Sequence, residues 1–375
     1  MRTIQLDGNN LSIEDVAAIA TRRASASLSD DARGRMAASR EVIDRIVDED
    51  RTVYGVTTGF GVFSDVRVSA REVRTLQRNL ILSHCAGVGD PFPPETVRAI
   101  MLLRANALAK GFSGIRLEVV DLLLEMLHRD LLPLIPSQGS VGASGDLAPL
   151  AHLAAALMGE GRIVVEGESR SASEALAAVG LQPITFEAKE GLAMINGTQA
   201  ISAVGSLSLE RASRLLDWSE IIAAMTLDGL LGTDAAFDDR IHQARPHAGQ
   251  LQVARRMREL LEGSELRESH RDCGQIQDAY SLRCIPQVHG AARDAISFAR
   301  ATMTTELNSA TDNPLVFPEQ DETVSGGNFH GAPVAMACDI ASIALTDMAS
   351  ISERRIERLV NPQLSGLPGF LVEEG

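Results

Sequence analysis

Residues 137–152 form a run rich in glycine and serine, SQGSVGASGDLAPLAH, with the tripeptide Ala143-Ser144-Gly145 near its centre. A loop of this composition can bend its backbone sharply. If the amide nitrogen of Gly145 attacks the carbonyl carbon of Ala143, a five-membered ring closes. Loss of two water molecules then turns Ser144 into an exocyclic methylidene. Glycine and alanine leave the reacting atoms unhindered and serine provides the leaving hydroxyl, so the tripeptide predicts an electrophile made from the chain itself.

Other interpretations of this loop start from the same residues. A phosphate cradle at a helix N-terminus is disfavoured, because Asp146 would be an acidic N-cap beneath an anion and no Lys-Ser or Lys-Thr pair follows. The run is not a G-x-S-x-G nucleophile elbow, because Asp146 stands where the last glycine should be. A plain structural loop remains the alternative to the electrophile.

Two further runs contain side chains that can bind an amino acid. Arg283 follows Tyr280 by three residues in QDAYSLRC (277–284), which places both on one face of a helix or turn. The planar fork of an arginine suits a carboxylate, although an ion pair with a nearby acid is the alternative. Asn196, in MINGTQ (194–199), can donate to a ring carbonyl or a substrate amine, or cap the following helix.

These runs resemble those of the ammonia-lyase family for histidine, phenylalanine and tyrosine, over essentially the whole chain. The resemblance is carried by the serine-containing loop and by the runs YGVTTGFG (54–61), MINGTQ, QDAYSLR and GGNFHG (326–331). Members of the family form the predicted ring, which is called methylidene-imidazolone (MIO). The resemblance implies MIO as a self-formed cofactor, no external cofactor, and a carbon–nitrogen lyase whose substrate is a small molecule, a free amino acid.

Removal of ammonia from an amino acid requires an electrophile for the amine, a base near the β-carbon and an anchor for the carboxylate. The resemblance implies Ser144 for the first role, Tyr54 for the second and Arg283 for the third. A tyrosine hydroxyl must be activated before it can act as a base near neutral pH. By itself, Tyr54 equally fits an ordinary aromatic residue in a turn.

The resemblance also implies four residues around these three. Tyr280 and Asn196 would orient the ring and the bound amino acid, while Gln277 and Phe329 would contact the substrate. Without the resemblance, Phe329 is one core aromatic among ten phenylalanines.

The substrate class is indicated by Ser83-His84, in the run NLILSHCAG (79–87). In the family, the residue pair at this position varies with the substrate class. Ser-His resembles the pair of the histidine branch, His-Leu that of the tyrosine branch and Phe-Leu that of the phenylalanine branch. A polar pair can hydrogen-bond an imidazole, whereas Phe-Leu would leave its nitrogens unpaired. We therefore expect conversion of L-histidine to trans-urocanate and ammonia. A tyrosine or phenylalanine ammonia-lyase, or an aminomutase, is the alternative within the family.

Composition argues against several other classes of protein. The net charge is −15 without a basic stretch, which disfavours nucleic acids and anionic membrane surfaces as partners. We see no basic-then-apolar signal segment and no apolar run long enough to span a bilayer. The four cysteines lack C-x-x-C spacing and the histidines lack H-E-x-x-H, so we expect neither disulfides nor a catalytic metal. We expect a soluble cytoplasmic protein.

Hydrophobic periodicity predicts a mainly α fold, with an N-terminal mixed region that contains short strands and then a long central helix bundle. The family resemblance implies that this bundle is of the fumarase/aspartase-like kind. We expect helices after Ser12, with Asp15 completing a capping box, and over 94–109, 114–132 and 199–231. Short strands are expected over 162–165 and 183–186. Apolar residues at heptad-like spacing mark two later helices: Ile296, Ala299, Met303 and Leu307, then Val334, Cys338, Ala341, Leu345 and Met348.

The predicted division is an N-terminal region, 1–197, with the MIO loop, the Tyr54 loop and Ser83-His84, followed by a bundle region, 198–375. Helices apolar over much of their circumference suggest burial between subunits, and the resemblance implies a homotetramer with shared sites. In the family a further helical C-terminal portion supplies a site glutamate, for which no residue here can be assigned. An inactive shortened form or a non-catalytic helical scaffold is therefore the alternative to an active lyase.

Overall fold

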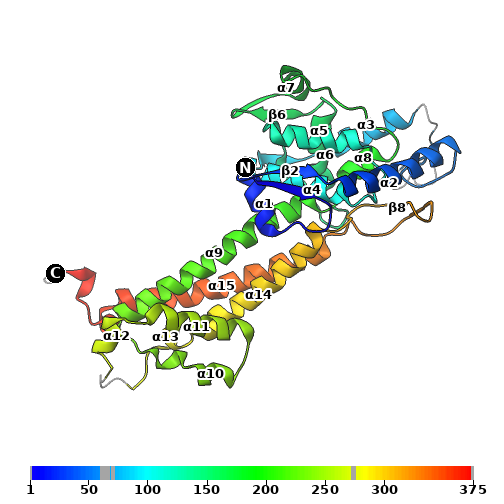
Figure 1. The fold of residues 1–375 in the computed structure, drawn as a ribbon. Coiled ribbons are helices and arrows are strands. Elements are labelled where there is room, and N and C mark those ends of the chain that lie inside the picture. Colours follow the sequence, from blue (N-terminus) through cyan, green and yellow to red (C-terminus); the bar gives the residue numbers. More distant parts are fainter. Residues whose placement is uncertain (1, 60–67, 69–71, 272–275, 373–375) are drawn as a thin grey trace. The chain divides into compact units, whose positions relative to one another are not determined.

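The computed structural model describes residues 2–59, 68, 72–271 and 276–372 (Figure 1). The chain forms two compact units. The first comprises Met1–Leu207 and Thr302–Ala335, and the second comprises Ser208–Ala301 and Met336–Gly375. Helices α9 (Gln199–Gly229), α14 (Ile285–Leu307) and α15 (Ala332–Val360) contribute residues to both units. The mainly α fold expected from the sequence is confirmed.

The first unit contains the short strands of the described chain. Its elements, besides its parts of α9, α14 and α15, are β1 (Arg2–Leu6), α1 (Ile13–Ala20), β2 (Ala24–Leu28), α2 (Asp30–Asp48), α3 (Val73–His84), β3 (Val88–Pro91), α4 (Pro94–Ala109), α5 (Leu117–His128), β4 (Leu132–Pro133), β5 (Pro136–Gln138), α6 (Leu147–Leu157), β6 (Arg162–Val165), β7 (Glu168–Ser171), α7 (Ala172–Ala178), α8 (Glu190–Ile195), β8 (Leu315–Phe317) and β9 (Glu322–Val324).

The helices of this unit begin where local chemistry favours them. The capping box expected at α1 is present, with the Ser12 hydroxyl accepting from the amide of Asp15 and the Asp15 carboxylate accepting from that of Ser12. Helix α4 begins at Pro94 as expected, and it is buried along almost its whole length between α1, α2 and α5. Helix α5 ends at His128, earlier than expected, because the chain turns at Asp130 with φ of +58°.

The strands form small separate sheets. Strand β1 pairs in parallel with β2, β3 is antiparallel to β5, β4, β6 and β7 form one antiparallel sheet, and β8 pairs with β9. The strand expected over 162–165 is confirmed as β6. The strand expected over 183–186 is wrong, because this segment has no strand partner. A tight turn at Glu166 and Gly167, both with positive φ, folds the chain directly back, so β7 takes the place beside β6.

The second unit consists of helices around an apolar core. Besides its parts of α9, α14 and α15, its elements are η2 (Asp234–Phe237), α10 (Asp239–Gln243), α11 (Ala248–Leu261), α12 (Glu265–Ser269), α13 (Tyr280–Arg283), α16 (Pro362–Ser365) and η3 (Gly369–Leu371). Phe237, Val253 and Met257 lie at the centre of this core and are completely buried. Leu282 packs into the same cluster and so holds the short helix α13 in place.

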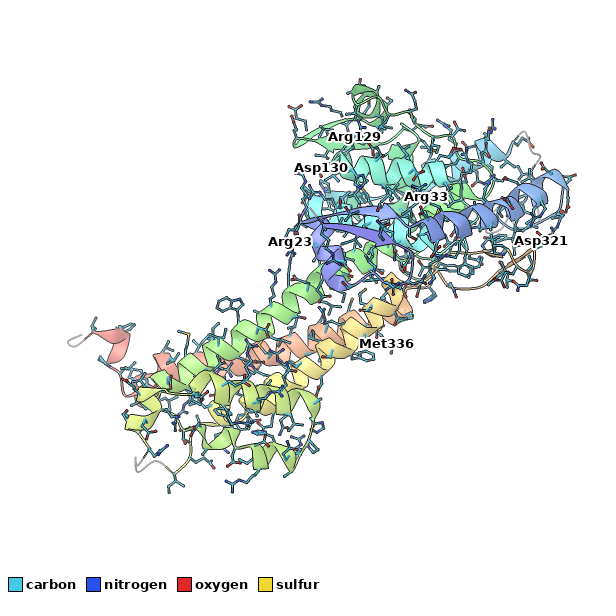
Figure 2. All side chains as sticks on the ribbon, viewed as in Figure 1. Arg23, Arg33, Arg129, Asp130, Asp321 and Met336 are labelled. Carbon is cyan, nitrogen blue, oxygen red and sulfur yellow. The ribbon has the colours of Figure 1, made fainter. Side chains whose placement is uncertain are left out.

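Helix α15 differs from the expectation in one respect. By length and composition its 29 residues could cross a membrane, whereas the sequence was expected to contain no such run. Small residues spread among Ile and Met raise its mean hydropathy without forming one obvious apolar block. Val334, Ala341 and Met348 of the expected stripe are buried, but Met336 on another face is 69% exposed (Figure 2).

Candidate functional site

The loop between β5 and α6 carries the predicted electrophile. Ala143 and Ser144 are exposed, whereas Gly145 is buried. The amide of Gly145 donates to the carbonyl oxygen of Gly142 at 3.2 Å, which closes the loop tightly around the two residues between them. Gly142 and Gly145 have φ of +76° and +80°, in the left-handed region that favours glycine.

The structure brings this loop together with two other predicted segments of the first unit. A Cβ on Gly145 would lie 2.7 Å from the carbonyl oxygen of Gly197 and 3.3 Å from that of Phe329. The amide of Gly331 donates to the carbonyl oxygen of Gly142 at 2.9 Å. The serine-containing loop therefore packs, backbone against backbone, on the Asn196-Gly197 turn and on the segment that contains Phe329.

Asp146 fixes the far end of the loop in an unexpected way. It stands at the N-cap position of α6 but makes no capping hydrogen bond there. Its buried carboxylate accepts instead from the Ser140 hydroxyl at 2.5 Å and from the amide of Ile201, in the first turn of α9, at 2.9 Å. Burial raises the pKa of Asp146, and these hydrogen bonds oppose the shift. The carboxylate thus ties the loop to the positive end of α9.

Asn196 lies buried in the turn between α8 and α9. Its side-chain Nδ2 donates to the carbonyl oxygen of Asn313 at 3.1 Å, and so points away from the role of a helix cap. Beneath the turn, Lys189 and Asp312 form a fully buried ion pair at 2.7 Å. Sequence reasoning missed this ion pair, and the residues around Lys189 give no signal of it, because Glu187 and Glu190 beside it in the sequence are equally plausible partners.

Ser83 and His84 occupy the last turn of α3. The carbonyl oxygen of Leu80 accepts from the Ser83 hydroxyl at 2.9 Å and lies 2.8 Å from Nδ1 of His84. The chain then enters β3, which pairs with β5 directly before the electrophile loop. A Cβ on Gly139 would lie 3.2 Å from the Cα of Gly87, so the segment after His84 lies against the start of that loop.

Tyr54 and Phe329 also belong to the first unit. Tyr54 is half-buried in the turn that follows α2, where Gly55 has φ of +71°. Phe60 and Gly61, the end of the run that contains Tyr54, lie outside the described residues. Phe329 is half-buried rather than part of the core, in keeping with a side chain at the wall of a site.

The remaining predicted residues belong to the second unit. Tyr280 begins α13 and is 66% exposed, Gln277 is exposed just before it, and Arg283 ends the helix half-buried. Among the described residues Arg283 forms no ion pair, and its Nε donates to the carbonyl oxygen of Asp278 at 2.9 Å. This bond leaves the two terminal nitrogens of the guanidinium to bind an anion.

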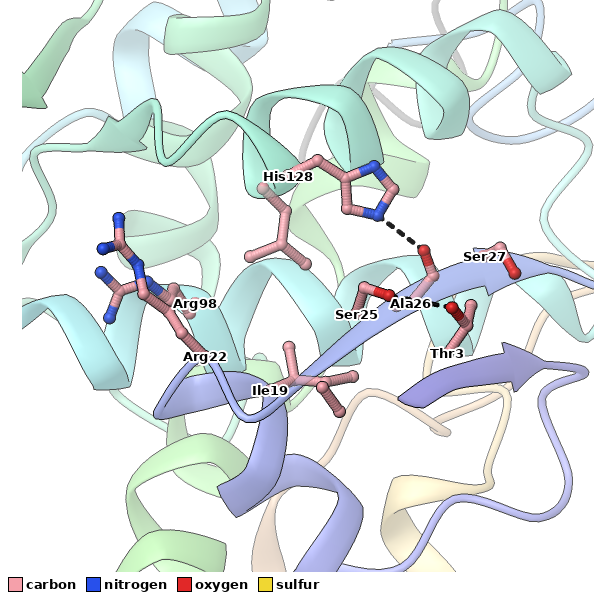
Figure 3. A pocket seen from close by; sticks show the side chains of 10 residues that line it. Thr3, Ile19, Arg22, Ser25, Ala26, Ser27, Arg98 and His128 are labelled. Atoms are coloured by element: carbon pink, nitrogen blue, oxygen red, sulfur yellow. Dashed lines mark hydrogen bonds between the residues drawn. The ribbon is translucent and has the colours of Figure 1, made fainter. Parts of the chain in front are cut away.

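The first unit contains one cavity close to the predicted site residues and another away from them. One of about 350 Å³ lies beside the Phe329 segment and is lined by Glu306, Thr311, Asn328 and His330 among others. Burial raises the pKa of Glu306, which accepts from Thr198. Another, of about 510 Å³, lies between β2, α4 and α5 and contains none of the predicted site residues (Figure 3). Among the described residues no cluster of three His, Cys, Asp or Glu side chains could hold a metal ion.

The sequence model of the family described as "Aromatic amino acid lyase" matches residues 11–375. The chain belongs to this family. Among its relatives, the histidine ammonia-lyase of Caldanaerobacter subterraneus subsp. tengcongensis is 54% identical over 375 residues, which is 100% of this chain and 74% of the relative. That of Myxococcus xanthus is 53% identical over 370 residues, 99% of this chain and 73% of the relative.

Solved structures of the aromatic amino acid lyase fold also match this chain. The histidine ammonia-lyase of Trypanosoma cruzi matches with a TM-score of 0.91 and 45% identity, over 100% of this chain and 70% of that protein. Phenylalanine aminomutase from Pantoea agglomerans matches with a TM-score of 0.94 and 35% identity, over 100% of this chain and 76% of that protein. The fold is thus shared by lyases and aminomutases, and the substrate must be argued from the site.

Proposed function

We propose that this chain is a carbon–nitrogen lyase that eliminates ammonia from L-histidine and releases trans-urocanate. The observation that carries the proposal is the packing of the Ser144 loop on the Asn196-Gly197 turn and on the Phe329 segment. In addition, the Ser83-His84 end of α3 is followed by β3, which pairs with β5 directly before the loop. Relatives named histidine ammonia-lyase, at about 50% identity over the full chain, support this choice of substrate.

The residues of the loop fit the MIO that the family uses. Gly145 is held in a backbone conformation that favours glycine, in a cradle that a Cβ would fill, and its amide faces back along the loop toward Gly142. Ala143 and Ser144 lie on the exposed side. When formed, MIO supplies an electrophilic carbon at position 144 that converts the substrate amine into a leaving group.

Arg283 anchors the substrate carboxylate in this proposal. Its Nε is already engaged with the backbone at Asp278, which fixes the plane of the guanidinium. The two terminal nitrogens then offer parallel N–H donors, the geometry that binds a carboxylate in bidentate fashion. Tyr280, three residues before Arg283 on α13, and Gln277 supply further polar groups beside the substrate.

Proton transfer and orientation fall to residues of the first unit. Tyr54 takes the proton from the β-carbon, as the family resemblance implies, and the adjacent Gly55 gives its turn the backbone freedom it needs. The amide of Asn196 orients the amine, since its position is fixed by the bond to Asn313. Phe329 forms an apolar wall that helps to exclude water.

Ser83 and His84 select the imidazole ring. The carbonyl oxygen of Leu80 can only accept a hydrogen bond, so the neutral His84 ring carries its proton on Nδ1 and presents Nε2 as an acceptor. An imidazole N–H of the substrate satisfies this acceptor, whereas a phenyl ring leaves it unpaired. This asymmetry favours histidine over phenylalanine.

The proposal extends to assembly and location. We place the enzyme in the cytoplasm as a homotetramer, because exposed apolar side chains of the second unit on α9 and α15 suit contacts with further copies. These include Leu215, Trp218, Ile222, Met225, Met336 and Ile343.

The first experiment measures urocanate by its ultraviolet absorbance after L-histidine is added to the purified protein, with L-tyrosine and L-phenylalanine in parallel. We expect product from histidine alone. Product from tyrosine or phenylalanine would assign another branch of the family, and ammonia retained on the β-carbon would identify an aminomutase. No product from any of the three would contradict lyase activity of this chain and favour the non-catalytic helical scaffold.

The Ser144→Ala variant tests the electrophile. The leaving hydroxyl is lost, so turnover should fall by about 10³-fold or more, and the intact mass should no longer lack two water molecules. Ser137→Ala, an exposed serine in the same run, is the matched control and should keep both properties. Substantial turnover by Ser144→Ala would contradict the mechanism.

A further inference from the structure

Arg104 on α4 is a charged side chain with no access to solvent. Among the residues that the structure describes it forms no ion pair, and Asp312, the acid that acts on it through space, is already paired with Lys189. Burial lowers the pKa of Arg104 to about 10, so the guanidinium still carries its charge at neutral pH. An arginine in such a place needs an explanation other than a salt bridge.

One nitrogen of Arg104 donates two hydrogen bonds to the turn between α8 and α9. Its Nη1 donates to the carbonyl oxygen of Asn196 at 2.9 Å and to Oε1 of Gln199 at 2.7 Å. The two acceptors flank Gly197 and Thr198. A Cβ on Gly197 would lie 2.5 Å from Nη1, so glycine is what allows the guanidinium to approach the backbone here.

The acceptors of Arg104 are themselves held in place. The Nε2 of Gln199 donates to the Thr311 hydroxyl at 2.7 Å, which turns its Oε1 toward Arg104. The Asn196 side chain donates to the carbonyl oxygen of Asn313. The turn is therefore fixed between α4 on one side and residues 311–313 on the other.

The other two nitrogens of the Arg104 guanidinium make no hydrogen bonds of this kind with the described residues. Nε and Nη2 are buried, and no described atom accepts a hydrogen bond from either. A buried donor without a partner lowers the stability of the fold. The contacts of Arg104 thus favour a role in placing the turn over a role in stability alone.

The same turn supports the Ser144 loop. The carbonyl oxygen of Gly197 accepts from the amide of Asp146 at 2.6 Å, and a Cβ on Gly145 would lie 2.7 Å from that oxygen. Any shift of Gly197 therefore moves the backbone on which Gly145 rests. It also moves the Asn196 amide on the preceding residue.

We propose that Arg104 is a positioning residue which, by clamping the carbonyl of Asn196 and the side chain of Gln199, sets both the Asn196 amide and the seat of Gly145. Its catalytic consequence rests on the proposed function. Its structural consequence, a fixed 196–199 turn, does not.

The test compares Arg104→Lys, which keeps the charge but loses the fork, and Arg104→Met, which loses both. Arg40→Lys is the control, because Arg40 is also buried in the first unit and donates to the backbone carbonyls of Gly114 and Ala188. Unlike Arg104 it forms ion pairs, and none of its described contacts is with residues 196–199. Three measurements are made on each protein: amide hydrogen exchange, intact mass, and steady-state kinetics with L-histidine, which give kcat and KM.

In Arg104→Lys we expect faster exchange at the amides of Asp146 and residues 196–202, and a larger fraction of chains that retain the two water molecules. We expect kcat to fall about 10²-fold, since small misplacements at a reacting centre cost this much, with KM nearly unchanged because Arg104 does not touch the substrate. Arg40→Lys should match the wild type in all three. Arg104→Met should show the same changes more strongly.

The outcomes separate the two proposals. Unchanged exchange at Asp146 and 196–202 in Arg104→Lys would overturn the clamp whatever the activity. Altered exchange with wild-type kcat and wild-type mass would overturn its role in the reaction. If the wild type does not turn over L-histidine, the proposed function fails, while exchange and mass still decide the clamp. Arg104→Lys keeps the size and charge of the side chain, and it carries the test if Arg104→Met does not fold.

Discussion

At the scale of the residue, backbone atoms rather than side chains make the decisive contacts of the Ser144 loop. Gly142 and Gly145 share nearly the same left-handed conformation. A Cβ on Gly142 would meet no atom within 4 Å, whereas a Cβ on Gly145 would meet the carbonyl oxygen of Gly197. Comparing Gly142 with Gly145 therefore separates the effect of the left-handed backbone conformation from the effect of the close approach of Gly197 to Gly145.

The change Gly145→Ala should therefore lower the free energy of unfolding more than Gly142→Ala does. Both variants lose about 1–2 kcal/mol to the left-handed conformation, and Gly145→Ala must in addition displace the 196–199 turn. Chemical denaturation measures the difference, and intact mass shows whether the ring still forms. Equal losses in the two variants would contradict a tight seat at Gly145.

His289 is a completely buried histidine of the second unit. Its Nε2 accepts from Nη2 of Arg355 at 3.1 Å, so Nδ1 carries the proton and donates to the Ser219 hydroxyl at 3.2 Å. Burial, with the positive charges of Arg355 and Arg293, lowers the pKa of His289 to about 3. The folded protein thus keeps this imidazole neutral.

The lowered pKa of His289 predicts a loss of stability in acid. Between about pH 6.5 and pH 3 the unfolded chain binds a proton at this position and the folded chain does not. The free energy of unfolding should fall by about 1.4 kcal/mol for each pH unit in this window because of His289 alone. His289→Gln, which keeps an acceptor and a donor, should show a shallower dependence when unfolding is measured at pH 6, 5 and 4. The same substitution at the exposed His247 should leave the slope as it is, and identical slopes for all three proteins would refute the assignment.

At the scale of the element, the pairing of β3 with β5 connects two predicted parts of the site. The strands link the end of α3, with Ser83 and His84, to the start of the Ser144 loop. His152 of α6 adds a further link, because its Nε2 accepts from the amide of Gly87 at 3.2 Å. Strand β5 before the Ser144 loop and helix α6 after it therefore both contact the segment that follows Ser83 and His84, and so fix where these two residues lie.

Replacing Ser83 and His84 together by Phe and Leu should change substrate selection. The polar acceptor is lost, so kcat/KM for L-histidine should fall by about 10-fold to 10²-fold, the size expected when about 1–3 kcal/mol of hydrogen bonding to the substrate is lost. Kinetics with L-histidine and L-phenylalanine in parallel measure the shift. The single change His84→Gln, which keeps an acceptor, should retain more activity on histidine than the double variant. Equal kcat/KM for both variants would mean that these residues do not face the ring.

At the scale of the whole molecule, each unit has its own core, but the second exposes much apolar surface. On α9 the exposed side chains recur at helical spacing, with Leu215, Trp218 and Ile222 at 50%, 61% and 56% exposure. Met336 and Ile343 of α15 are exposed to about the same degree. Surface of this kind is typical of helices that pack against other chains.

Association should therefore depend on Trp218, the single tryptophan of the chain. Sedimentation velocity should find a species larger than the monomer, and Trp218→Glu should shift it toward the monomer. Because the indole would be buried on association, wild-type fluorescence should move to shorter wavelength as protein concentration rises. Arg214→Gln, a change at an exposed charge on the same helix, is the control. A monomer at every concentration would contradict the proposed assembly.

Sequence alone determined the features that depend on local chemistry. The tripeptide around Ser144, the capping box of α1, the helix at Pro94–Ala109 and the strand at Arg162–Val165 follow from residue type and spacing within a few positions. The runs that carry the resemblance indicated the family for the same reason, because each is a short stretch of contiguous residues. The strand expected at 183–186 failed where local propensity had to compete with a tighter turn nearby.

Tertiary structure alone decided which distant segments meet. It returned residues 302–335 to the first unit, placed the backbone of Phe329 on Gly145, and gave the Asp146 carboxylate to α9 instead of α6. It also buried Arg104 under the Asn196 turn. These contacts join residues separated by 55 or more positions. Hydrophobic periodicity within one helix or strand does not indicate which distant element packs against it. The physical reason is that such pairings arise from the packing of complete elements, in which the entropy of closing long loops is offset by burial shared among all of them.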